Sequence, residues 1–574
     1  MFSSLSDIQK EIVFNKSGRF VVRACPGSGK TYCVGARLAR LIQGWKKQTE
    51  GIAVLSFTNV AWQEIEKKCS EQFCIKKIQY PHFIGTIDSF VNQYIFLPFG
   101  HLVLGSNSRP TLVGEPHGTW SGGNYDRDPN QHFTICSFDI NGNLIPTVDK
   151  QLFGFKWDNN KDGSENKNVT NLRNSKWSLL KKGYATQADA NYFAMKIIEK
   201  YPNIAKSIVC RFPTFIIDEA QDTSDVQMKI IDLLIENGLN EIMLVGDPDQ
   251  AIFEWNDAKP ELLNQKYTDW TNSIILNENR RSSQNICNFT HKISSFDTPS
   301  TAVSEVKDFS HVPKIVVYNE NNINQAITEF ITECKSHNII VSQETTAVIS
   351  RSQGLVNKIL DIPETRTQTS PWTDKHTKDF AKGKFLYDNG KFKDGFRIIL
   401  KTILKICNKL SYCSERDIDQ AISEKGFIET QSFVYSFIHT LPNTINTSIG
   451  QWINTANNNL TNKNHKLQLA VHKDCTIYTF PQLFSNEDKQ IYNKDFRYGT
   501  VHSVKGETFE AVLLILKTKS IGKAYKTILN DNTPISDSEE LRIVYVGLTR
   551  PRKILWLAVP NDENKIAWEN KTSN

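Results

Sequence analysis

The chain has 574 residues, of which 39% are hydrophobic and 23% are charged, a composition typical of folded globular proteins rather than disordered or fibrous ones. The formal net charge of +6 is small for this length, so it permits an anionic partner without demanding one. The eleven cysteines form no CxxC pair and no apolar stretch approaches 18 residues. Zinc ribbons, redox motifs and membrane spans therefore have no support, and the scattered thiols favour a cytoplasmic protein.

The first segment, residues 8–90, alternates strand-like apolar runs with helical patterns. The run 20–22 leads into a glycine-rich turn and a helix, and the run 53–57 is followed by a helix with apolar residues on one face. This repetition of strand and helix predicts a parallel sheet that is covered by helices on both faces.

Two changes of composition interrupt this alternation. Residues 105–175 are rich in Gly, Asn, Asp and Pro, and residues 361–494 have a mostly helical pattern. Strand-like runs occur outside these two segments, at 214–217, 242–245, 273–276, 314–317, 347–349, 512–515 and 555–558. The simplest interpretation is two α/β domains, each interrupted by an insertion.

A glycine-rich motif follows the first strand. Residues 24–31 match the pattern A/G-x-x-x-x-G-K-[S/T] between a strand and a helix, which is the context that a phosphate-binding loop requires. Glycines let backbone N–H groups turn toward phosphate oxygens, and the helix N-terminus adds partial positive charge. We expect Lys30 to reach the β- and γ-phosphates of ATP and Thr31 to bind Mg²⁺. The nucleotide-binding residues of this loop are Ala24, Cys25, Pro26, Gly27, Ser28, Gly29, Lys30 and Thr31.

Two adjacent carboxylates, Asp218 and Glu219, follow the apolar run 214–217. Open α/β sheets bind ligands at the carboxyl ends of their strands, so this pair is placed to reach the same nucleotide. We expect Asp218 to hold Mg²⁺, directly or through water, and Glu219 to orient or deprotonate the attacking water. Taken alone, the pair could equally be the acidic first turn of a helix. Together with the phosphate loop, the catalytic interpretation is favoured.

With these two motifs in place, the chain resembles the UvrD/Rep/PcrA family of superfamily 1 DNA helicases, whose motifs occur here in the family's order between about Leu5 and Leu557. Residues 5–9, Leu-Ser-Asp-Ile-Gln, look like the family's Q motif, which implies that Gln9 reads the adenine edge. The resemblance also implies that Arg37 lies near the base.

Two further motifs resemble the family's contacts to single-stranded DNA. They span residues 55–59 and 85–90, and Asp88 in the second motif stands where the family usually has histidine. The DNA-binding residues that these two motifs imply are Phe57, Thr58, Asn59, Thr86 and Ser89.

The segment 245–255 closely matches the family's third motif, which implies that Gln250 senses the γ-phosphate and that Phe253 and Trp255 stack on bases. Stacking on an aromatic ring is worth about 1–3 kcal/mol per base and tolerates any sequence, which suits a motor that moves along a strand. Without its neighbours, Trp255 would be interpreted as a core residue. Asn256 follows it where the family often has arginine.

Three motifs in the second half imply the remaining contacts. Residues 276–282 resemble L-x-x-N-Y-R-S, which implies that Arg281 reaches the γ-phosphate. Arg280 replaces the tyrosine that stacks on adenine, and a guanidinium can also stack on a π face. Residues 500–509 are similar to T-x-H-x-x-K-G-x-E-F, which implies that His502 contacts DNA and that Gly506 lies near the γ-phosphate.

The position that binds ribose in the family is a glutamate. Thr508 stands there in this chain, with Glu507 one position earlier. Residues 540–550 match the family's last motif, which makes Arg550 the candidate for a second arginine finger.

The resemblance implies an α/β fold of two RecA-like parallel-sheet P-loop motor domains, each with an inserted accessory subdomain. The expected boundaries are 1–92 with 205–276 for the first motor domain, 277–360 with 495–574 for the second, and 93–204 and 361–494 for the two insertions. ATP would bind between the motor domains, where the catalytic residues would be Glu219, Gln250, Arg281 and Arg550.

The activity implied by the resemblance is translocation along single-stranded DNA or a tailed duplex, 3′ to 5′ by analogy, with ATP and Mg²⁺ as cofactors and with unwinding. Two alternatives stay open. One is a DNA-sensing ATPase subunit that regulates a partner nuclease and unwinds little, as in the UvrD-like subunits of phage-defence systems of the Gabija type. The other is an RNA motor. Strand displacement separates the first alternative from a helicase, and ATPase stimulation by DNA compared with RNA separates the second.

Overall fold

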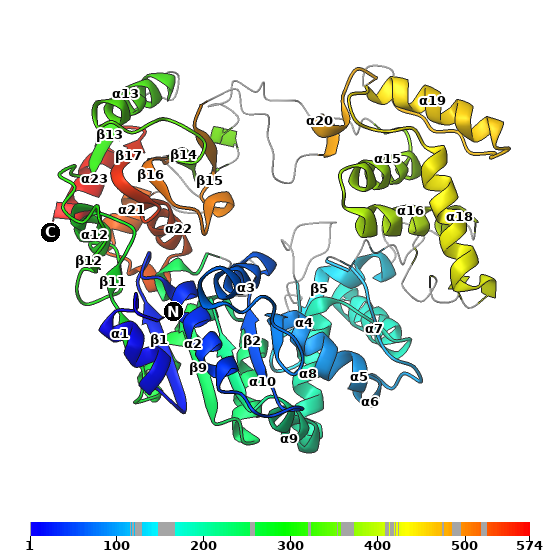
Figure 1. Cartoon of the computed structure of the whole chain (residues 1–574), viewed down its shortest axis with the longest axis horizontal. Helices are drawn as coiled ribbons and strands as arrows, with labels where there is room; N and C mark the ends of the chain where they lie inside the picture. Colours follow the sequence, from blue (N-terminus) through cyan, green and yellow to red (C-terminus); the bar gives the residue numbers. More distant parts are fainter. Residues whose placement is uncertain are drawn as a thin grey trace. The chain divides into compact units, whose positions relative to one another are not determined.

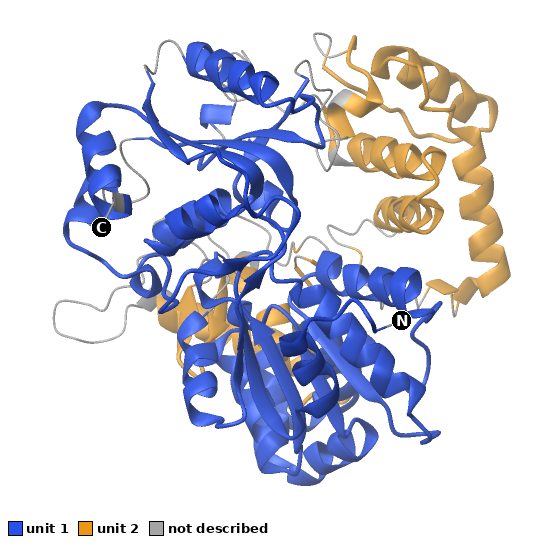
Figure 2. Ribbon diagram, turned by 60° about the vertical axis from the view of Figure 1, so that its left-hand side comes forward, with its two compact units in different colours: residues 1–103, 191–363, 493–574 blue, residues 104–190, 364–492 orange. Residues whose placement is uncertain are grey.

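In the computed structural model, the described residues are 2–114, 116–117, 120, 129–146, 167–252, 259–318, 323–352, 354–356, 372–407, 413, 418, 421–422, 424–472, 476–484, 495–517 and 525–573. The chain forms two compact units (Figure 2). Unit 1 comprises residues 1–103, 191–363 and 493–574, and unit 2 comprises residues 104–190 and 364–492.

Unit 1 contains a six-stranded, wholly parallel sheet with the strand order β10-β1-β9-β8-β2-β3 (Figure 1). Its strands are β1 (Arg19–Ala24), β2 (Ile52–Ser56), β3 (Phe83–Thr86), β8 (Thr214–Ile217), β9 (Glu241–Gly246) and β10 (Ile274–Leu276). Strand β2 is buried along its whole length, as expected of a continuous apolar run in a parallel sheet whose two faces are covered. The parallel sheet predicted from residues 8–90 is confirmed.

Helices α2 (Lys30–Gln43) and α3 (Asn59–Phe73) pack on this sheet. Val34 of α2 and Ile65 of α3 share one buried apolar cluster with Val54 of β2. Each such fully buried aliphatic side chain contributes about 1.5–3 kcal/mol relative to its exposed state. This packing fixes the first turn of α2, and with it the phosphate loop, against the carboxyl edge of the sheet.

A second parallel sheet of unit 1 has the strand order β13-β17-β16-β14-β15. Its strands are β13 (Lys314–Val317), β14 (Thr346–Ser350), β15 (Arg497–Thr500), β16 (Phe509–Ile515) and β17 (Pro551–Val559). Helix α22 (Glu539–Leu548) packs on it closely, because a Cβ added at Gly547 would lie only 3.1 Å from Leu514 Cδ2. A residue with a side chain at that position would push the helix away from the sheet.

Each of the two sheets is interrupted by one inserted segment of the chain. The chain leaves the first sheet after β3 and rejoins it at β8, and it leaves the second sheet after β14 and rejoins it at β15. The segments of unit 2, 104–190 and 364–492, are narrower than the insertions 93–204 and 361–494 expected from the sequence. Helix α9 (Pro202–Arg211), for example, belongs to unit 1.

The first segment of unit 2 is built on short elements. They are β4 (Thr111–Leu112), a 3₁₀ helix (Pro129–Ile135), β5 (Cys136–Phe138), β6 (Leu144–Pro146), α7 (Lys167–Lys181), β7 (Tyr184–Ala185) and the start of α8 (Gln187–Lys200). Strands β5 and β6 pair antiparallel, and β4 and β7 pair parallel.

A buried ion pair lies inside this segment. Lys176 Nζ is 2.9 Å from Asp189 Oδ2, and neither side chain has any exposed surface. The same ammonium group donates to the carbonyl oxygens of Phe133 (3.0 Å) and Cys136 (2.6 Å). A buried charge is tolerated only when it is paired and hydrogen-bonded, and here the ammonium is both.

The second segment of unit 2 is mostly helical in its described residues. Its main helices are α15 (Lys375–Asp388), α16 (Phe392–Cys407), α18 (Phe427–Thr440), α19 (Ile449–Asn462) and α20 (Phe480–Phe484). They share one apolar core, in which Trp452 is 1% exposed and donates its indole N–H to Pro442 O (2.8 Å). Within the described ranges, no helix has both the length and the apolarity that crossing a bilayer requires.

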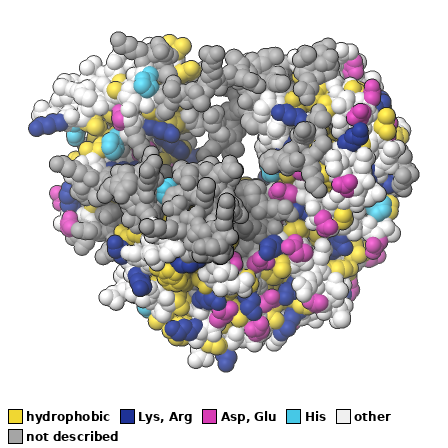
Figure 3. Space-filling view, turned by 180° about the vertical axis from the view of Figure 1, so that it is seen from behind, with side chains coloured by type: hydrophobic (Ala, Val, Ile, Leu, Met, Phe, Trp, Pro, Cys, Tyr) yellow, Lys and Arg dark blue, Asp and Glu magenta, His cyan; other side chains and the backbone are white. Residues whose placement is uncertain are grey.

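Charged side chains are mixed on the face of the molecule that Figure 3 shows. Among the described residues visible there, basic and acidic groups are interspersed rather than separated into fields of one sign. The described residues on that face therefore form no extended field of one sign.

The ion pair inside unit 2 predicts a large effect on stability. Lys176→Met leaves the Asp189 carboxylate buried without its counter-charge, which costs about 3–5 kcal/mol. The double variant Lys176→Met/Asp189→Asn removes both charges, keeps the hydrogen bond from Thr186 N–H (2.9 Å), and recovers most of that loss. Urea unfolding with hydrogen exchange in α7 measures both variants. A single variant as stable as the wild type would contradict the burial of the pair.

Candidate active site

The phosphate loop connects β1 to α2. Gly27 and Gly29 have φ angles of 72° and 79°, in the left-handed region where an L side chain is strained. Gly29 is the N-cap of α2 and offers no side-chain cap, so the first N–H groups of the helix gain no side-chain acceptor from it. A helix that begins in this way presents backbone donors and partial positive charge to an anion.

Lys30 is the first residue of α2, and its ammonium group lies 3.4 Å from Oε1 of Glu219. That buried nitrogen has no hydrogen-bond partner among the described residues, and neither has the hydroxyl of Ser28. Burial alone would lower the pKa of Lys30, but the carboxylates around it, Glu219 foremost, raise it. The loop therefore holds a cation and a hydroxyl whose hydrogen-bonding capacity an anion would fill.

Asp218 and Glu219 stand at the carboxyl end of β8. Asp218 is 1% exposed, and its N–H donates to Leu55 O (2.9 Å) of β2. Burial and the charge of Glu219 raise the pKa of Asp218. Burial would raise the pKa of Glu219 as well, but the charge of Lys30 holds it below its usual range. Glu219 also has a φ of 52°, a conformation that costs a non-glycine residue about 1–3 kcal/mol.

The turn after β9 carries Gln250. Its Nε2 donates to Asp247 Oδ2 (2.6 Å), and its Oε1 accepts a hydrogen bond from Arg550 Nη2 (3.1 Å). Gln250 therefore connects a loop of the first sheet to a residue that precedes β17 of the second sheet. Its amide is oriented from both sides, because the carboxylate needs a donor and the guanidinium needs an acceptor.

Arg281 and Arg550 are the cations that the second half of unit 1 contributes. Arg281 Nη1 donates to Thr549 O (2.9 Å), and Arg550 Nε donates to Val546 O (2.8 Å). Burial, followed by the charge of Arg281, lowers the pKa of Arg550 to about 9, and burial lowers the pKa of Arg281 to about 10. Buried cations of this kind favour the binding of an anion, because it offsets their loss of hydration.

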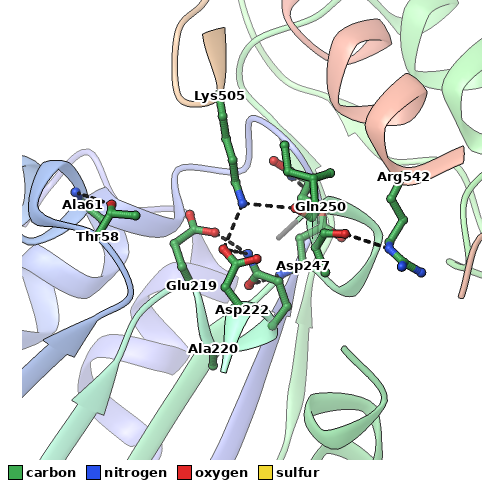
Figure 4. A network of polar contacts seen from close by, with 12 residues as sticks. Thr58, Ala61, Glu219, Ala220, Asp222, Asp247, Gln250, Lys505 and Arg542 are labelled. Atoms are coloured by element: carbon green, nitrogen blue, oxygen red, sulfur yellow. Dashed lines mark hydrogen bonds and ion pairs between the residues drawn. The ribbon is translucent and has the colours of Figure 1, made fainter. Parts of the chain in front are cut away.

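Lys505 also crosses between the two sheets, and the sequence analysis gave it no role. Its ammonium group donates to Asp222 Oδ2 (2.9 Å) and to Gln250 O (3.2 Å), as Figure 4 shows. The available signal was the lysine of the pattern T-x-H-x-x-K-G, which marks the position without indicating its partners.

Residues from both sheets line one cavity of about 790 Å³ in unit 1, a volume within the range of small-ligand sites. The predicted site residues that line it are Gly27, Ser28, Gly29, Lys30, Thr31, Phe57, Thr58, Glu219, Gln250, Arg280, Arg281, His502, Gly506 and Arg550. Other predicted residues do not line it, namely Gln9, Ala24, Cys25, Pro26, Arg37, Asn59, Thr86, Ser89 and Asp218. Phe253 and Trp255 lie outside the described residues.

Comparison with known proteins agrees with the order of the motifs. Residues 5–271 match the family model of the UvrD/REP helicase N-terminal domain. The matched range includes the phosphate loop, the Asp218–Glu219 pair and the turn that carries Gln250. Residues 5–271 belong to the UvrD-like helicases.

Individual UvrD-like relatives match over parts of their length. The exonuclease/helicase subunit RexA of Streptococcus pneumoniae is 34% identical over 112 residues, which are 18% of this chain and 9% of that protein. DNA helicase II of Haemophilus influenzae is 26% identical over 307 residues, 51% of this chain and 40% of the relative. The ATP-dependent DNA helicase srs2 of Schizosaccharomyces pombe is 26% identical over 370 residues, which are 59% of this chain and 40% of that protein. The chain thus spans less than half the length of each of these relatives.

The Q motif of the UvrD-like family lies on α1 (Asp7–Lys10) and the turn before it. Gln9 is buried, and its Nε2 donates to Ser28 O of the phosphate loop (3.4 Å). Its Oε1 accepts the N–H of Ser6, which completes a capping box at the start of α1. The structure therefore places Gln9 behind the phosphate loop, where it supports Ser28, and does not bring its side chain to the cavity lining.

Arg37 is buried and bonded to backbone carbonyl groups. Its guanidinium donates to Ile12 O (2.5 Å) and Lys16 O (2.9 Å) and lies 4.9 Å from the centroid of the Phe20 ring. Both carbonyl groups belong to the π-helical turn Glu11–Asn15 and the residue after it, where backbone acceptors lack helical partners. Arg37 therefore satisfies these buried acceptors, and its proximity to a base stays a prediction.

The two candidates for the ribose position are distinguished by their surroundings. Thr508 lines the cavity, whereas the Glu507 carboxylate accepts from Nη2 (3.2 Å) and Nε (3.3 Å) of Arg497. Thr508, rather than Glu507, is the residue placed to meet a ligand.

Two other predicted nucleotide-binding residues lie at the cavity. Gly506 has a φ of 94°. Arg280 also lines the cavity, and its Nη2 contacts Glu278 Oε2 (2.9 Å).

Three of the predicted DNA-binding residues line the cavity. Thr58 lines it together with Phe57, and its hydroxyl caps α3 by accepting from Ala61 N–H (3.3 Å), as Figure 4 shows. Asn59 lies next to them but uses Oδ1 to accept from Trp62 Nε1 (3.0 Å). His502 also lines the cavity, with Nε2 at 3.3 Å from Ile252 O.

The second predicted DNA-binding motif forms the start of α4 (Ile87–Val91). Thr86 is the N-cap of that helix and accepts from Ser89 N–H (3.1 Å). Asp88, which stands where the UvrD-like family usually has histidine, accepts from Asn191 Nδ2 and Gln227 Nε2, both at 2.9 Å. Asp88 is thus held by internal donors, which accounts for an acidic residue at a position expected to face a phosphate.

The phosphate loop predicts a specific effect for Gly27→Ala. A Cβ there would lie 2.7 Å from Arg281 Cβ and 2.9 Å from Asn279 Oδ1, so the loop has to move away from the segment that carries Arg281. We expect nucleotide affinity to fall at least about tenfold, since a displaced loop loses backbone contacts worth more than about 1.4 kcal/mol.

Gly18→Ala is the matched control for this variant. Gly18 has nearly the same φ of 74° but no atom within 4 Å of the added Cβ, so it reports the backbone strain alone. Titration with a fluorescent ATP analogue measures both variants. Equal affinities for Gly27→Ala and Gly18→Ala would show that the collision with Arg281 and Asn279 does not matter.

Proposed function

We propose that this protein is an ATP-driven motor that translocates 3′ to 5′ along single-stranded DNA and unwinds duplex DNA with a single-stranded tail. The observation that carries the proposal is the composition of the cavity. Lys30 and Glu219 come from the first sheet of unit 1, whereas Arg281 and Arg550 come from the second part. Neither part supplies all the groups that phosphoryl transfer requires.

The two sheets would be the cores of two RecA-like motor domains. The first comprises residues 1–92 and 205–276, and the second comprises 277–360 and 495–574, with 93–204 and 361–494 inserted in them. The wholly parallel strand orders and the position of the phosphate loop after β1 support this division.

The cavity suits a triphosphate with its magnesium ion. Its cations outnumber the carboxylates that line it, and Lys30 Nζ and Ser28 Oγ lack hydrogen-bond partners among the described residues. Mg²⁺ would be held by the hydroxyl of Thr31 at the start of α2 and by the carboxylate of Asp218 at the end of β8. When bound, the ion neutralises part of the phosphate charge.

Glu219 is the residue proposed to orient and deprotonate the attacking water. Its carboxylate is held ionised beside Lys30, which is the state that a base requires. Lys30 and the α2 amides would bind the phosphates, and Arg281 and Arg550 would stabilise the negative charge that develops on the transferred group. Gln250, already bonded to Arg550, would respond to the γ-phosphate.

Movement would follow from the cross-sheet contacts. Lys505 and Arg550 reach from the second part to Asp222 and Gln250 of the first. Closure on a triphosphate and reopening after hydrolysis would alter these contacts, a hinge between two states that the ligand biases. Phe253, Trp255 and His502 would grip the strand alternately.

The nuclease-regulating alternative receives little support. The match to the exonuclease/helicase subunit RexA covers 18% of this chain, and the matches to the DNA helicases cover 51% and 59%. Association with a partner nuclease therefore stays an expectation, and the unwinding function is the one proposed.

The proposal predicts that Lys30→Ala and Glu219→Gln each lower the rate of ATP hydrolysis at least about 100-fold. Lys30→Ala removes a cation from the phosphate site, and Glu219→Gln removes the base while keeping the side-chain shape. Steady-state ATPase assays with and without single-stranded DNA measure both. Lys47→Ala and Glu50→Gln are matched controls, because this ion pair is at the surface after α2. Wild-type turnover in either active-site variant would refute the assignment of the site.

The translocation step predicts a separate effect for Trp255→Ala. Loss of one stacking contact worth about 1–3 kcal/mol should raise the concentration of single-stranded DNA needed for half-maximal stimulation about 5- to 150-fold. Basal hydrolysis should be unchanged. Trp270→Ala, on the same stretch of chain, is the control. Strand displacement from a duplex with a 3′ tail, compared with a 5′ tail, gives the second readout. Unaltered stimulation would place Trp255 in a core.

A further inference from the structure

Gln221 lies at the centre of the polar network below the cavity. It belongs to the 3₁₀ turn Ala220–Asp222 that follows Glu219, it is fully buried, and it is not among the residues that line the cavity. Its side chain nevertheless contacts three groups around the site, namely the carboxylates of Glu219 and Asp222 and the backbone N–H of Asp247. Figure 4 labels these three partner residues.

The contacts of Gln221 use both ends of its carboxamide. Nε2 donates to Glu219 Oε2 and, at 3.5 Å, to Asp222 Oδ2. Oε1 accepts the backbone N–H of Asp247 (3.1 Å) at the end of β9. Since carboxylates only accept and an amide N–H only donates, these partners fix which end of the carboxamide faces which group. A glutamate or a methionine at this position cannot reproduce the arrangement.

Gly246 makes room for this side chain. A Cβ added there would collide with Gln221 Oε1 and would lie 2.7 Å from Leu263 Cδ2 and 3.2 Å from the Gln221 backbone nitrogen. The approach of Gln221 to the backbone of β9 therefore requires a glycine directly before Asp247. The carboxamide therefore packs directly against the backbone of β9.

The orientation of the Glu219 carboxylate depends on its hydrogen bond with Gln221. Its backbone is in the left-handed region, so the direction of its side chain is not secured by regular secondary structure. One carboxylate oxygen faces Lys30 at 3.4 Å, and the other accepts from Gln221. Lys30 would turn toward the phosphates when a nucleotide binds, which leaves Gln221 as the group that still orients the carboxylate.

We propose that Gln221 is a positioning residue that fixes the carboxylate of Glu219 relative to the turn after β9. This inference rests on the proposed function, because it assigns Glu219 the role of orienting the attacking water. It adds a mechanical connection, since the turn held by Gln221 carries Gln250 and leads to Phe253 and Trp255. A shift of that turn is transmitted to Glu219 through one rigid side chain.

The test uses Gln221→Met and Gln221→Glu in the full chain. Met keeps the length and removes both hydrogen-bonding ends. Glu keeps the acceptor for Asp247 N–H and places a third carboxylate beside Glu219 and Asp222. We expect kcat for ATP hydrolysis to fall roughly 10- to 100-fold in both, as misplacement of a catalytic group by about 1 Å does. The KM for ATP should stay within about twofold, since Gln221 does not line the cavity.

Gln227→Met is the matched control. Gln227 lies on the adjacent helix α10 (Asp225–Glu236) and is also buried. Its carboxamide also donates a hydrogen bond to a carboxylate, that of Asp88. We expect it to lower the melting temperature about as much as Gln221→Met while leaving kcat within twofold. The separation of kcat from KM and from stability distinguishes a positioning role from a structural one.

The outcomes separate this inference from the proposed function. If the wild type hydrolyses ATP and Glu219→Gln does not, but Gln221→Met keeps the wild-type kcat, Gln221 does not position Glu219 and the inference is wrong. A rise in KM with kcat unchanged would also overturn it. If the wild type and Glu219→Gln have the same rate, the proposed function itself has failed.

Discussion

Burial of charge is the constraint on which the site depends. Lys30, Arg281 and Arg550 line the cavity of unit 1 and are largely shielded from water. A buried cation is stable only when another group replaces its lost hydration. The compensation is internal here, since Glu219 lies beside Lys30 and Gln250 accepts from Arg550. Both compensating groups belong to the proposed catalytic set. The residues that would act on a triphosphate are thus the residues that hold these cations without it. Ligand binding would replace the Glu219 carboxylate and the Gln250 amide oxygen with phosphate oxygens as their partners.

Parallel sheets explain why these groups converge. Strands β1, β9 and β8 are neighbours in the first sheet, so the segments after their carboxyl ends lie side by side. Those segments are the phosphate loop, the turn with Gln250 and the Asp218–Glu219 pair. Arg550 directly precedes β17 of the second sheet, and Arg281 lies between β10 of the first sheet and α12 (Gln284–His291), so neither arginine belongs to the interior of a strand. Each sheet keeps its own apolar core.

The sequence allowed prediction of what is local and not of what is brought together by the fold. The phosphate loop could be predicted because strand, glycines and helix follow one another within a few residues. The contacts of Arg37 could not be predicted, since the direction of its side chain depends on the packing of α2 against the turn Glu11–Asn15. Gln221 lies two residues after Glu219, and Lys505 lies inside the motif 500–509, yet Gln221 also accepts from Asp247 N–H, 26 positions away, and Lys505 donates to Asp222, 283 positions away. No periodicity or spacing encodes such pairs, and the strand order that creates them is not written in any one segment.

Three hydrogen bonds from the second part of unit 1 end on one short stretch of the first. Arg550 donates to the side chain of Gln250, Lys505 to its carbonyl oxygen, and Arg542 to Ala251 O (2.7 Å). That stretch is also the one that Gln221 ties to Glu219 through Asp247 N–H. In the proposed motor, a movement of the second part would therefore reach the catalytic carboxylate and the DNA-stacking residues through the same few residues. Coupling of this kind requires no pathway across the molecule. It requires only that residues 247–252 move as one piece, and the hydrogen bonds at both ends of that turn are what would make them do so.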